Sequence, residues 1–151
     1  MTEADRKIIR ECLTNLLSRR EHSQAELLNK LRARGLETEL SRQIISEFAE
    51  RGWQSDARFA ASFARQRFAR GLGEIRIRGE LRQRQVADPL IEQALAELEA
   101  DWFEAARALY QRKYTKPVTD FKEQQKRARH LQYKGFTQEQ IRYAMEPQGD
   151  G

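Results

Sequence analysis

The feature that most constrains the fold of this chain is a repeat with a period of 50 residues. When the sequence is written in rows of 50, five columns keep their chemistry from row to row. Each row predicts a helix, a tight turn led by a cation, a second helix and a connecting third helix. Such a unit buries its apolar face only against a neighbouring unit. The five columns are Leu31, Leu81 and Leu131; Arg34, Arg84 and Lys134; Gly35, Gln85 and Gly135; Leu36, Val86 and Phe136; and Ile45, Leu95 and Met145.

The composition favours helices along the whole chain. Valine occurs only at positions 86 and 118, and Leu, Ala, Arg, Glu and Gln dominate. The sequence therefore predicts an all-α protein of tandem three-helix repeats that form an elongated, curved array. The predicted divisions are an N-terminal helix at 1–20, repeats at 21–70 and 71–115, a shorter third repeat at 116–146, and a disordered tail at 147–151.

Local signals mark where the helices begin and end. A first helix over about residues 5–18 is expected to bury a wide apolar face made of two stripes, and its Cys12 is expected to be a structural thiol. The stripes are Ile8, Cys12 and Leu16, and Ile9, Leu13 and Leu17. Gly71 and Gly73 are expected in the left-handed conformation between two helices. The predicted N-caps are Ser23, Thr38, Ser55, Asp88 (followed by Pro89), Asp101, Asp120 and Thr137, and Ser23, Asp120 and Thr137 each have Glu or Gln three residues later.

The stretch from Arg58 to Arg84 concentrates the positive charge. It contains eight arginines against two acids, a net charge of +6, whereas the whole chain carries +5. Every cation in it is arginine, whose planar fork suits phosphate or carboxylate. Solvated helix faces would explain such a run equally well. We expect these arginines to contact a polyanion or an acidic protein face: Arg58, Arg65, Arg67, Arg70, Arg76, Arg78, Arg82 and Arg84.

Within this stretch the spacing separates core from surface. Phe59 and Phe63 lie four residues apart and are expected to pack together, with Arg58 and Arg65 on another face. In the next helix, Arg76, Glu80 and Arg84 are spaced four residues apart for ion pairs. We expect Arg58, Arg65, Arg78 and Arg82 to be exposed, so that their replacement spares the fold and weakens binding.

The middle of the chain, from Asp56 to Leu81, fits the pattern D-x-RFA-x-x-F-x-x-x-R-x-x-x-G-x-G-x-x-x-I-x-x-EL. In this motif the sequence resembles the RecX family, regulators of the RecA recombinase, and the resemblance covers nearly the whole chain. Two departures are Ser55-Asp56, where paired acids are common, and Gln85, where a glycine is expected. The matching residues are Asp56, Arg58, Phe59, Ala60, Phe63, Arg67, Gly71, Gly73, Ile77, Glu80 and Leu81; Arg20, Ser23, Glu26, Leu27 and Leu31; and Leu131, Gly135, Phe136 and Ile141.

The resemblance implies a protein that binds the RecA–DNA filament and mostly inhibits RecA's ATPase, co-protease and strand-exchange activities. It thereby implies a role in DNA repair, recombination and the SOS response. The implied partners are the RecA filament and, more weakly, single-stranded and double-stranded DNA, with the protein acting as a monomer. The alternative is a stand-alone basic helical module that binds DNA without RecA, with Phe59, Phe63 and Phe68 available for base stacking.

Other function classes find little support in the sequence. There is no phosphate-binding glycine loop and no CxxC motif, and the two histidines, His22 and His130, lie far apart. We therefore expect neither an enzyme nor a metal or other cofactor, and we expect His22 to be a surface or capping residue. The chain has neither a membrane-spanning apolar run nor a signal-peptide core, so a cytoplasmic protein without membrane contact is expected.

Overall fold

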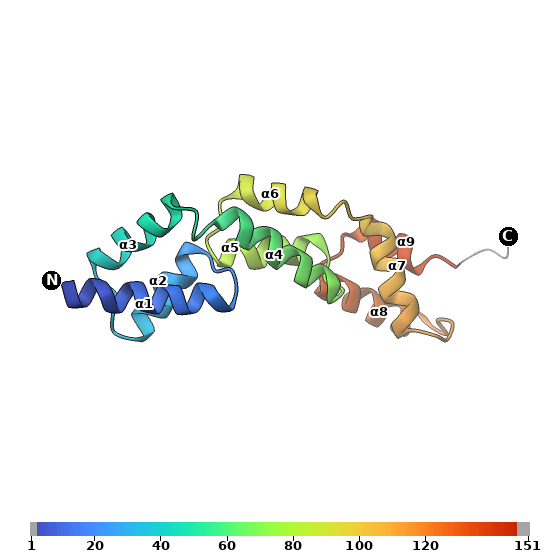
Figure 1. Ribbon diagram of the computed structural model, residues 1–151. Coiled ribbons are helices and arrows are strands. Elements are labelled where there is room, and N and C mark those ends of the chain that lie inside the picture. The colour runs from blue at the N-terminus through green and yellow to red at the C-terminus, as the bar shows by residue number, and fades with distance from the viewer. Residues whose placement is uncertain (1–2, 148–151) are drawn as a thin grey trace. The chain divides into compact units, whose positions relative to one another are not determined.

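The computed structural model describes residues 3–147, and this part of the chain is built from nine helices without a strand (Figure 1). The all-α prediction is confirmed. The predicted tail at 147–151 falls almost entirely outside the described residues. The helices are α1 (Glu3–Arg19), α2 (Gln24–Ala33), α3 (Glu39–Glu50), α4 (Asp56–Ala69), α5 (Glu74–Gln83), α6 (Asp88–Glu97), α7 (Trp102–Lys113), α8 (Phe121–Lys134) and α9 (Gln138–Met145).

The chain divides into two compact units. Unit 1 comprises Met1–Phe63 and Leu81–Ala94, and unit 2 comprises Ala64–Glu80 and Leu95–Gly151. Helices α4 and α5 therefore each contribute residues to both units. The arginine-rich stretch is divided in the same way, so its members are described below unit by unit.

The core of unit 1 lies among α1, α2 and α3. Ile9, Leu13 and Leu16 of α1 are buried there together with leucines of α2 and apolar side chains of α3. The expectation for Ile8 is wrong, because this side chain is 49% exposed. Cys12 is buried as expected, and the Arg34 Nη1 lies 2.6 Å from its Sγ. The buried face of α1 therefore draws on both expected stripes and consists of Ile9, Cys12, Leu13 and Leu16.

The 50-residue repeat is visible in three helix ends of the same geometry. Leu31, Leu81 and Leu131 are fully buried, and the carbonyl of each accepts a hydrogen bond from the amide five residues later, at 2.8, 3.2 and 3.2 Å. The residue between, at 35, 85 and 135, is left-handed each time, with φ of 71°, 59° and 105°. This is the Schellman ending of an α-helix. The period is thus confirmed as a structural repeat.

Two residues near these turns differ from expectation. Gln85 keeps the left-handed conformation although it carries a side chain, so the turn survives the departure from glycine. Gly73 is not left-handed, unlike Gly71 at φ 86°. A Cβ on Gly73 would lie 2.5 Å from the carbonyl carbon and oxygen of Gly135. Glycine is needed at position 73 because two backbones of unit 2 approach closely there.

The predicted N-caps are confirmed with one shift. Ser23 and Thr137 form capping boxes with the residue three positions later, and Asp101 caps α7. Helix α6 begins one residue earlier than predicted, because the Ala87 carbonyl accepts from the Ile91 amide at 3.1 Å. Asp88 is therefore the first residue of the helix and not its cap. Thr38, Ser55 and Asp120 also accept hydrogen bonds from backbone amides at the starts of α3, α4 and α8.

The core of unit 2 gathers α7, α8 and α9. Leu131 and Phe136 pack with Ala106 of α7 and with Ile141 and Ala144 of α9. Trp102, Leu109 and Tyr110 of α7 are partly buried against this cluster. The segment Tyr114–Asp120, which contains the TKPVT sequence, connects α7 to α8 without regular structure. Helix α8 is therefore fixed by its inner face, and its outer face is left to solvent.

Candidate polyanion interface

Three of the eight arginines belong to unit 1, and two of these reach carboxylates distant in sequence. Arg58 lies in the first turn of α4, which Ser55 caps by accepting from the Arg58 amide at 3.1 Å. The Arg58 Nε donates to Glu21 at 2.6 Å, and its Nη1 donates to the carbonyl of Gly52 at 2.9 Å. The side chain is half exposed, as expected. Its charge is nevertheless matched by an acid 37 residues earlier.

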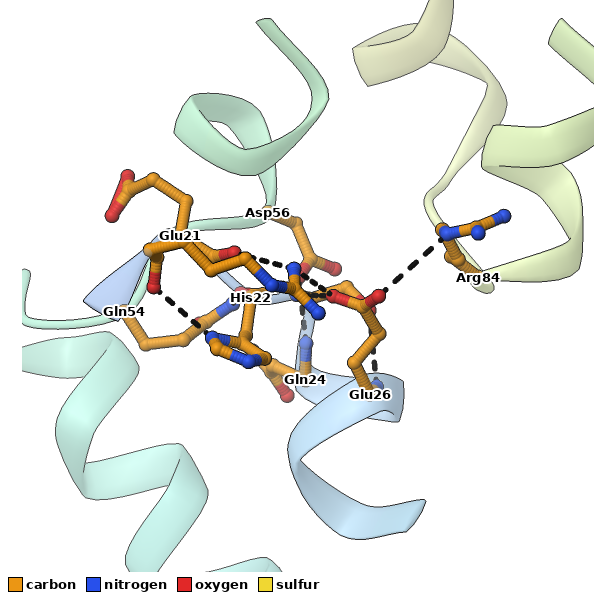
Figure 2. Close-up of polar contacts among 9 residues, drawn as sticks. Glu21, His22, Gln24, Glu26, Gln54, Asp56 and Arg84 are labelled. Carbon is orange, nitrogen blue, oxygen red and sulfur yellow. Dashed lines mark hydrogen bonds and ion pairs between the residues drawn. The ribbon is translucent and has the colours of Figure 1, made fainter. Parts of the chain in front are cut away.

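Arg84 is held on both of its sides. Its Nε lies 3.6 Å from Glu26 (Figure 2). Its guanidinium carbon lies 4.6 Å from the centre of the Phe63 ring. Glu26 also contacts Arg20 at 3.2 Å and completes the capping box of α2 by accepting from the Ser23 amide. A single carboxylate thus serves two arginines and one backbone amide. Arg84 is part of the framework of unit 1.

A small polar cluster lies beside this carboxylate. Gln54 is almost fully buried, and its Nε2 donates to the carbonyl of His22 at 3.1 Å and to Asp56 at 2.9 Å (Figure 2). Asp56 also accepts from the Gln24 amide at 2.9 Å, which joins the start of α4 to the start of α2. The motif residue Asp56 therefore has a structural role in unit 1.

His22 belongs to the same cluster, and the expectation that it is a surface or capping residue is wrong. It is 3% exposed, and its Nδ1 lies 3.0 Å from the carbonyl of Arg20. Burial, reinforced by the nearby Arg20 charge, lowers the pKa of His22 below its usual value. The local sequence does not indicate this burial, because Gln54, which donates to the His22 carbonyl, lies 32 residues away. Its ring is a buried structural group.

Arg82 is the third arginine of unit 1, and it is exposed as expected. Its Nε lies 3.2 Å from Asp88, and both side chains are more than half exposed. An ion pair in such a position contributes at most about 1 kcal/mol to stability. Arg82 is therefore accessible, although an acid already lies beside it.

In unit 2, Glu80 holds two arginines. It lies 3.1 Å from Arg67 and 3.3 Å from Arg76, which confirms the ion pair expected between Arg76 and Glu80. The side chains of Arg67 and Glu80 are each only 19% exposed. Arg76 also donates to the carbonyl of Tyr133 at 3.4 Å, and its guanidinium lies over that tyrosine ring. These arginines connect α4, α5 and α8 within the unit.

Arg78 differs from the expectation of an exposed side chain, because only 25% of it is accessible. It lies 3.9 Å from Glu74, four residues earlier on α5. Glu74 in turn accepts a hydrogen bond from the Nε2 of Gln140 on α9 at 2.9 Å. Arg78 thus belongs to a set of polar contacts that tie α5 to α9 within unit 2.

Arg65 and Arg70 are the two members of the set that remain available. Both are exposed, and neither has a carboxylate within 4.0 Å anywhere in residues 3–147. Arg65 lies on α4, and Arg70 follows its last turn. Of the eight predicted contact residues, these two carry charge that no carboxylate of residues 3–147 neutralises.

The aromatic residues of α4 are packed. Phe59 and Phe63 are buried, with ring centres 5.6 Å apart, as expected. Phe68 is half-buried and meets the ring of Trp102 edge-on at 5.4 Å. The stand-alone DNA-binding alternative assigned base stacking to these three rings, and their burial removes that support.

Two other kinds of site, a metal cluster and a membrane-spanning helix, are absent from the described residues. Residues 3–147 contain no group of three His, Cys, Asp or Glu side chains placed to hold a metal ion. Among the helices of those residues, none combines the length and apolar character needed to cross a bilayer.

Comparison with known proteins identifies the family. Sequence models of the second and third three-helix domains of RecX match residues 55–95 and 99–145. The regulatory protein RecX of Halorhodospira halophila is 41% identical over 137 residues, which span 90% of this chain and 85% of that protein. This chain belongs to the RecX family. The RecX of Vibrio vulnificus is 43% identical over 131 residues, 86% of each chain.

Solved RecX structures share the fold. The crystal structure of RecX from Lactobacillus salivarius matches with a TM-score of 0.79 over 95% of this chain and 96% of that one, at 22% identity. The two RecX domain models begin near the starts of α4 and α7, so each matched domain holds three successive helices. The divisions at 21–70, 71–115 and 116–146 start elsewhere, since a period fixes spacing but not phase. Those divisions stay a prediction.

Proposed function

We propose that this protein binds the nucleoprotein filament that RecA forms on DNA and restrains RecA's ATPase, co-protease and strand-exchange activities. The observation that carries the proposal is membership of the RecX family, whose relatives named above are regulatory proteins and align with 86–90% of the chain. In this proposal the protein is a monomeric cytoplasmic regulator of DNA repair, recombination and the SOS response. It is not an enzyme and uses no cofactor.

The distribution of ion pairs favours two arginines of the stretch from Arg58 to Arg84 as the residues that contact the filament. Arg65 and Arg70 are exposed and have no acidic partner in residues 3–147, whereas Arg67 and Arg76 share Glu80. A cation without a partner can bind phosphate or a partner's carboxylate without first breaking an internal ion pair. We therefore assign the filament contact first to Arg65 and Arg70, and only secondarily to the exposed but paired Arg58 and Arg82.

RecA's ATPase on single-stranded DNA, measured while this protein is titrated into the reaction, tests the proposal. We expect the rate of ATP hydrolysis to fall as the protein concentration rises. The control is a second titration after the filament is allowed to form, which separates inhibition of assembly from action on the filament. An ATPase that stays unchanged over a wide concentration range of folded protein would contradict the proposal.

Binding to bare DNA separates this function from the stand-alone alternative. We expect bare single-stranded and double-stranded DNA to be bound more weakly than the filament, with an affinity that falls as salt rises, because phosphate contacts release counterions. If the protein binds bare DNA as tightly as the filament and leaves the RecA ATPase unchanged, the stand-alone module is the better account.

A further inference from the structure

One face of α8 in unit 2 carries a line of exposed side chains that the proposed function does not use. Lys122, Lys126, Arg129 and Tyr133 are separated by four, three and four residues, which places them on one side of a helix. All four are exposed, whereas Arg127 and Leu131 on the inner side are buried. We call these four residues the α8 stripe. At 1.5 Å per residue it extends over about 16 Å.

The positive charge of the α8 stripe is not neutralised within the described part of the chain. Its three cations have no carboxylate within 4.0 Å in residues 3–147. The single acid in the sequence of α8, Glu123, lies 3.1 Å from the buried Arg127. Like charges four residues apart, such as Lys122 and Lys126, destabilise a helix by roughly 0.2–0.5 kcal/mol. The three cations of the stripe therefore form no ion pair that supports the fold, and their charge suits an external polyanion.

The stripe ends at an aromatic ring that is prepared for stacking. Tyr133 is 70% exposed, and the guanidinium carbon of Arg76 lies 4.8 Å from its ring centre. Arg76 also donates to the Tyr133 carbonyl at 3.4 Å and is itself fixed by Glu80 at 3.3 Å. The ring is thus supported from one side, and most of its surface faces solvent. Any of the nucleobases can stack on such a ring, because every base has a π-face.

The placement of charged residues on the helices of this chain disfavours sequence-specific binding in the major groove of a DNA duplex. In a helix-turn-helix, the second helix enters the major groove and reads base edges. Here the helix after the turn, α9, carries only Arg142 and Glu139 as charged residues. The equivalent helix α6 has the sequence DPLIEQALAE, with three acids and no cation. The cations lie on the helix before the turn, where they can follow a backbone but do not reach base edges.

We propose that the α8 stripe is a binding site for single-stranded nucleic acid. Lys122, Lys126 and Arg129 bind successive phosphates, and a base stacks on Tyr133. Binding is independent of sequence, because neither phosphates nor stacking distinguish the bases. The site goes beyond the filament contact proposed above, since it requires no RecA and lies outside the arginine-rich stretch.

Fluorescence anisotropy of a labelled oligodeoxythymidine, titrated with the full chain in the absence of RecA, tests the site. At about 0.1 M salt the triple variant Lys122→Ala/Lys126→Ala/Arg129→Ala is expected to bind at least about tenfold more weakly, and its salt slope to fall by about 2. The matched control is Lys7→Ala/Arg19→Ala/Lys30→Ala, which removes the same charge from exposed, unpaired positions of unit 1. This control should change affinity and slope much less.

A second pair of variants, one test and one control, examines the aromatic ring of the site. Tyr133→Ala is expected to weaken binding by about 5- to 150-fold while leaving the salt slope unchanged, because stacking releases no counterions. Phe121→Ala removes a ring that is exposed to the same extent, 71%, but lies on another face of α8, and should have no effect. All these side chains are exposed, so circular dichroism should report folded variants.

Three results would overturn the proposal. Equal losses in the α8 and unit 1 triple variants would mean diffuse attraction without a site. Tighter binding of a duplex than of a single strand through the same residues would contradict single-strand recognition. An effect of the stripe variants that arises only when RecA is present would assign the stripe to a protein partner. Because the assay contains no RecA, its result is independent of the ATPase test of the proposed function.

Discussion

The arginine-rich stretch and the α8 stripe are both basic, but they use their charge in opposite ways. In the stretch from Arg58 to Arg84, six of eight arginines have a carboxylate within 4.0 Å. In the α8 stripe, none of the three cations has such a partner in residues 3–147. Positive charge in a sequence is therefore a poor measure of the charge that a folded protein offers to its partner.

The preference for arginine in the stretch has a structural explanation. The planar guanidinium can bind a carboxylate through one edge while its face covers an aromatic ring. Arg84 does both, with Glu26 at 3.6 Å and the Phe63 ring at 4.6 Å. The guanidinium groups that suggested phosphate binding mostly bind carboxylates of the protein itself. A lysine at position 84 would retain the charge and lose this geometry.

The largest expected effect comes from the core beneath the arginines. Phe59→Ala removes a buried ring and is expected to lower the free energy of unfolding by about 3–5 kcal/mol. Phe121→Ala removes an exposed ring and should stay within about 0.5 kcal/mol. Chemical denaturation of both variants measures the difference. A stable Phe59→Ala protein that fails to bind its partner would instead place this ring in the interface.

The repeated leucines should give the next largest effects. Replacement of Leu31, Leu81 or Leu131 by Ala is expected to cost about 2–5 kcal/mol each, because all three are fully buried at equivalent helix ends. Thermal unfolding followed by circular dichroism measures the loss. If one of the three changes were neutral, the corresponding repeat would not depend on this shared position.

Smaller losses of stability are expected when a mostly buried and an exposed carboxylate, both in ion pairs, are each neutralised. Glu80→Gln keeps the shape but removes the charge that Arg67 and Arg76 both contact, and it should cost about 1–3 kcal/mol. Asp88→Asn removes the exposed partner of Arg82 and should cost less than about 1 kcal/mol. The two free energies of unfolding are compared at low salt. Equal costs would show that burial does not separate the two pairs.

The smallest effect on stability is expected for the unpaired arginines. Arg65→Ala/Arg70→Ala should change the free energy of unfolding by less than about 0.5 kcal/mol, because neither side chain has a carboxylate partner in residues 3–147. Denaturation curves of the wild type and of this variant should nearly coincide. A large loss of stability would mean that these arginines hold the fold and would remove the distinction between available and internal charge.

The parts of the structure that local sequence determines could be predicted. The capping residues Ser23, Thr38 and Thr137 act on amides within three residues, so spacing alone reveals them. Gln85 was the exception, because a residue with a side chain argued against the left-handed conformation that it nevertheless adopts. The elongated, curved shape stays a prediction.

The features that the sequence did not reveal depend on distant partners. Glu21 lies 37 residues before Arg58, and the carbonyl bonded to Gln54 lies 32 residues away at His22. No count of local charge locates such pairs. The α8 stripe was different, because its spacing was visible in the sequence. Its charge is less dense than that of the arginine-rich stretch, so charge density did not point to it. That denser stretch mixes available and paired cations.

The most direct test of this account compares two arginine pairs in the RecA ATPase assay. Arg65→Ala/Arg70→Ala and Arg58→Ala/Arg82→Ala remove the same charge from exposed positions, but only the second pair has carboxylate partners, Glu21 and Asp88. We predict that the first variant needs a concentration on the order of tenfold higher for half-inhibition, while the second inhibits nearly as well as the wild type. Equal inhibition by both variants, or a greater loss for the paired arginines, would contradict the claim that unpaired charge forms the contact.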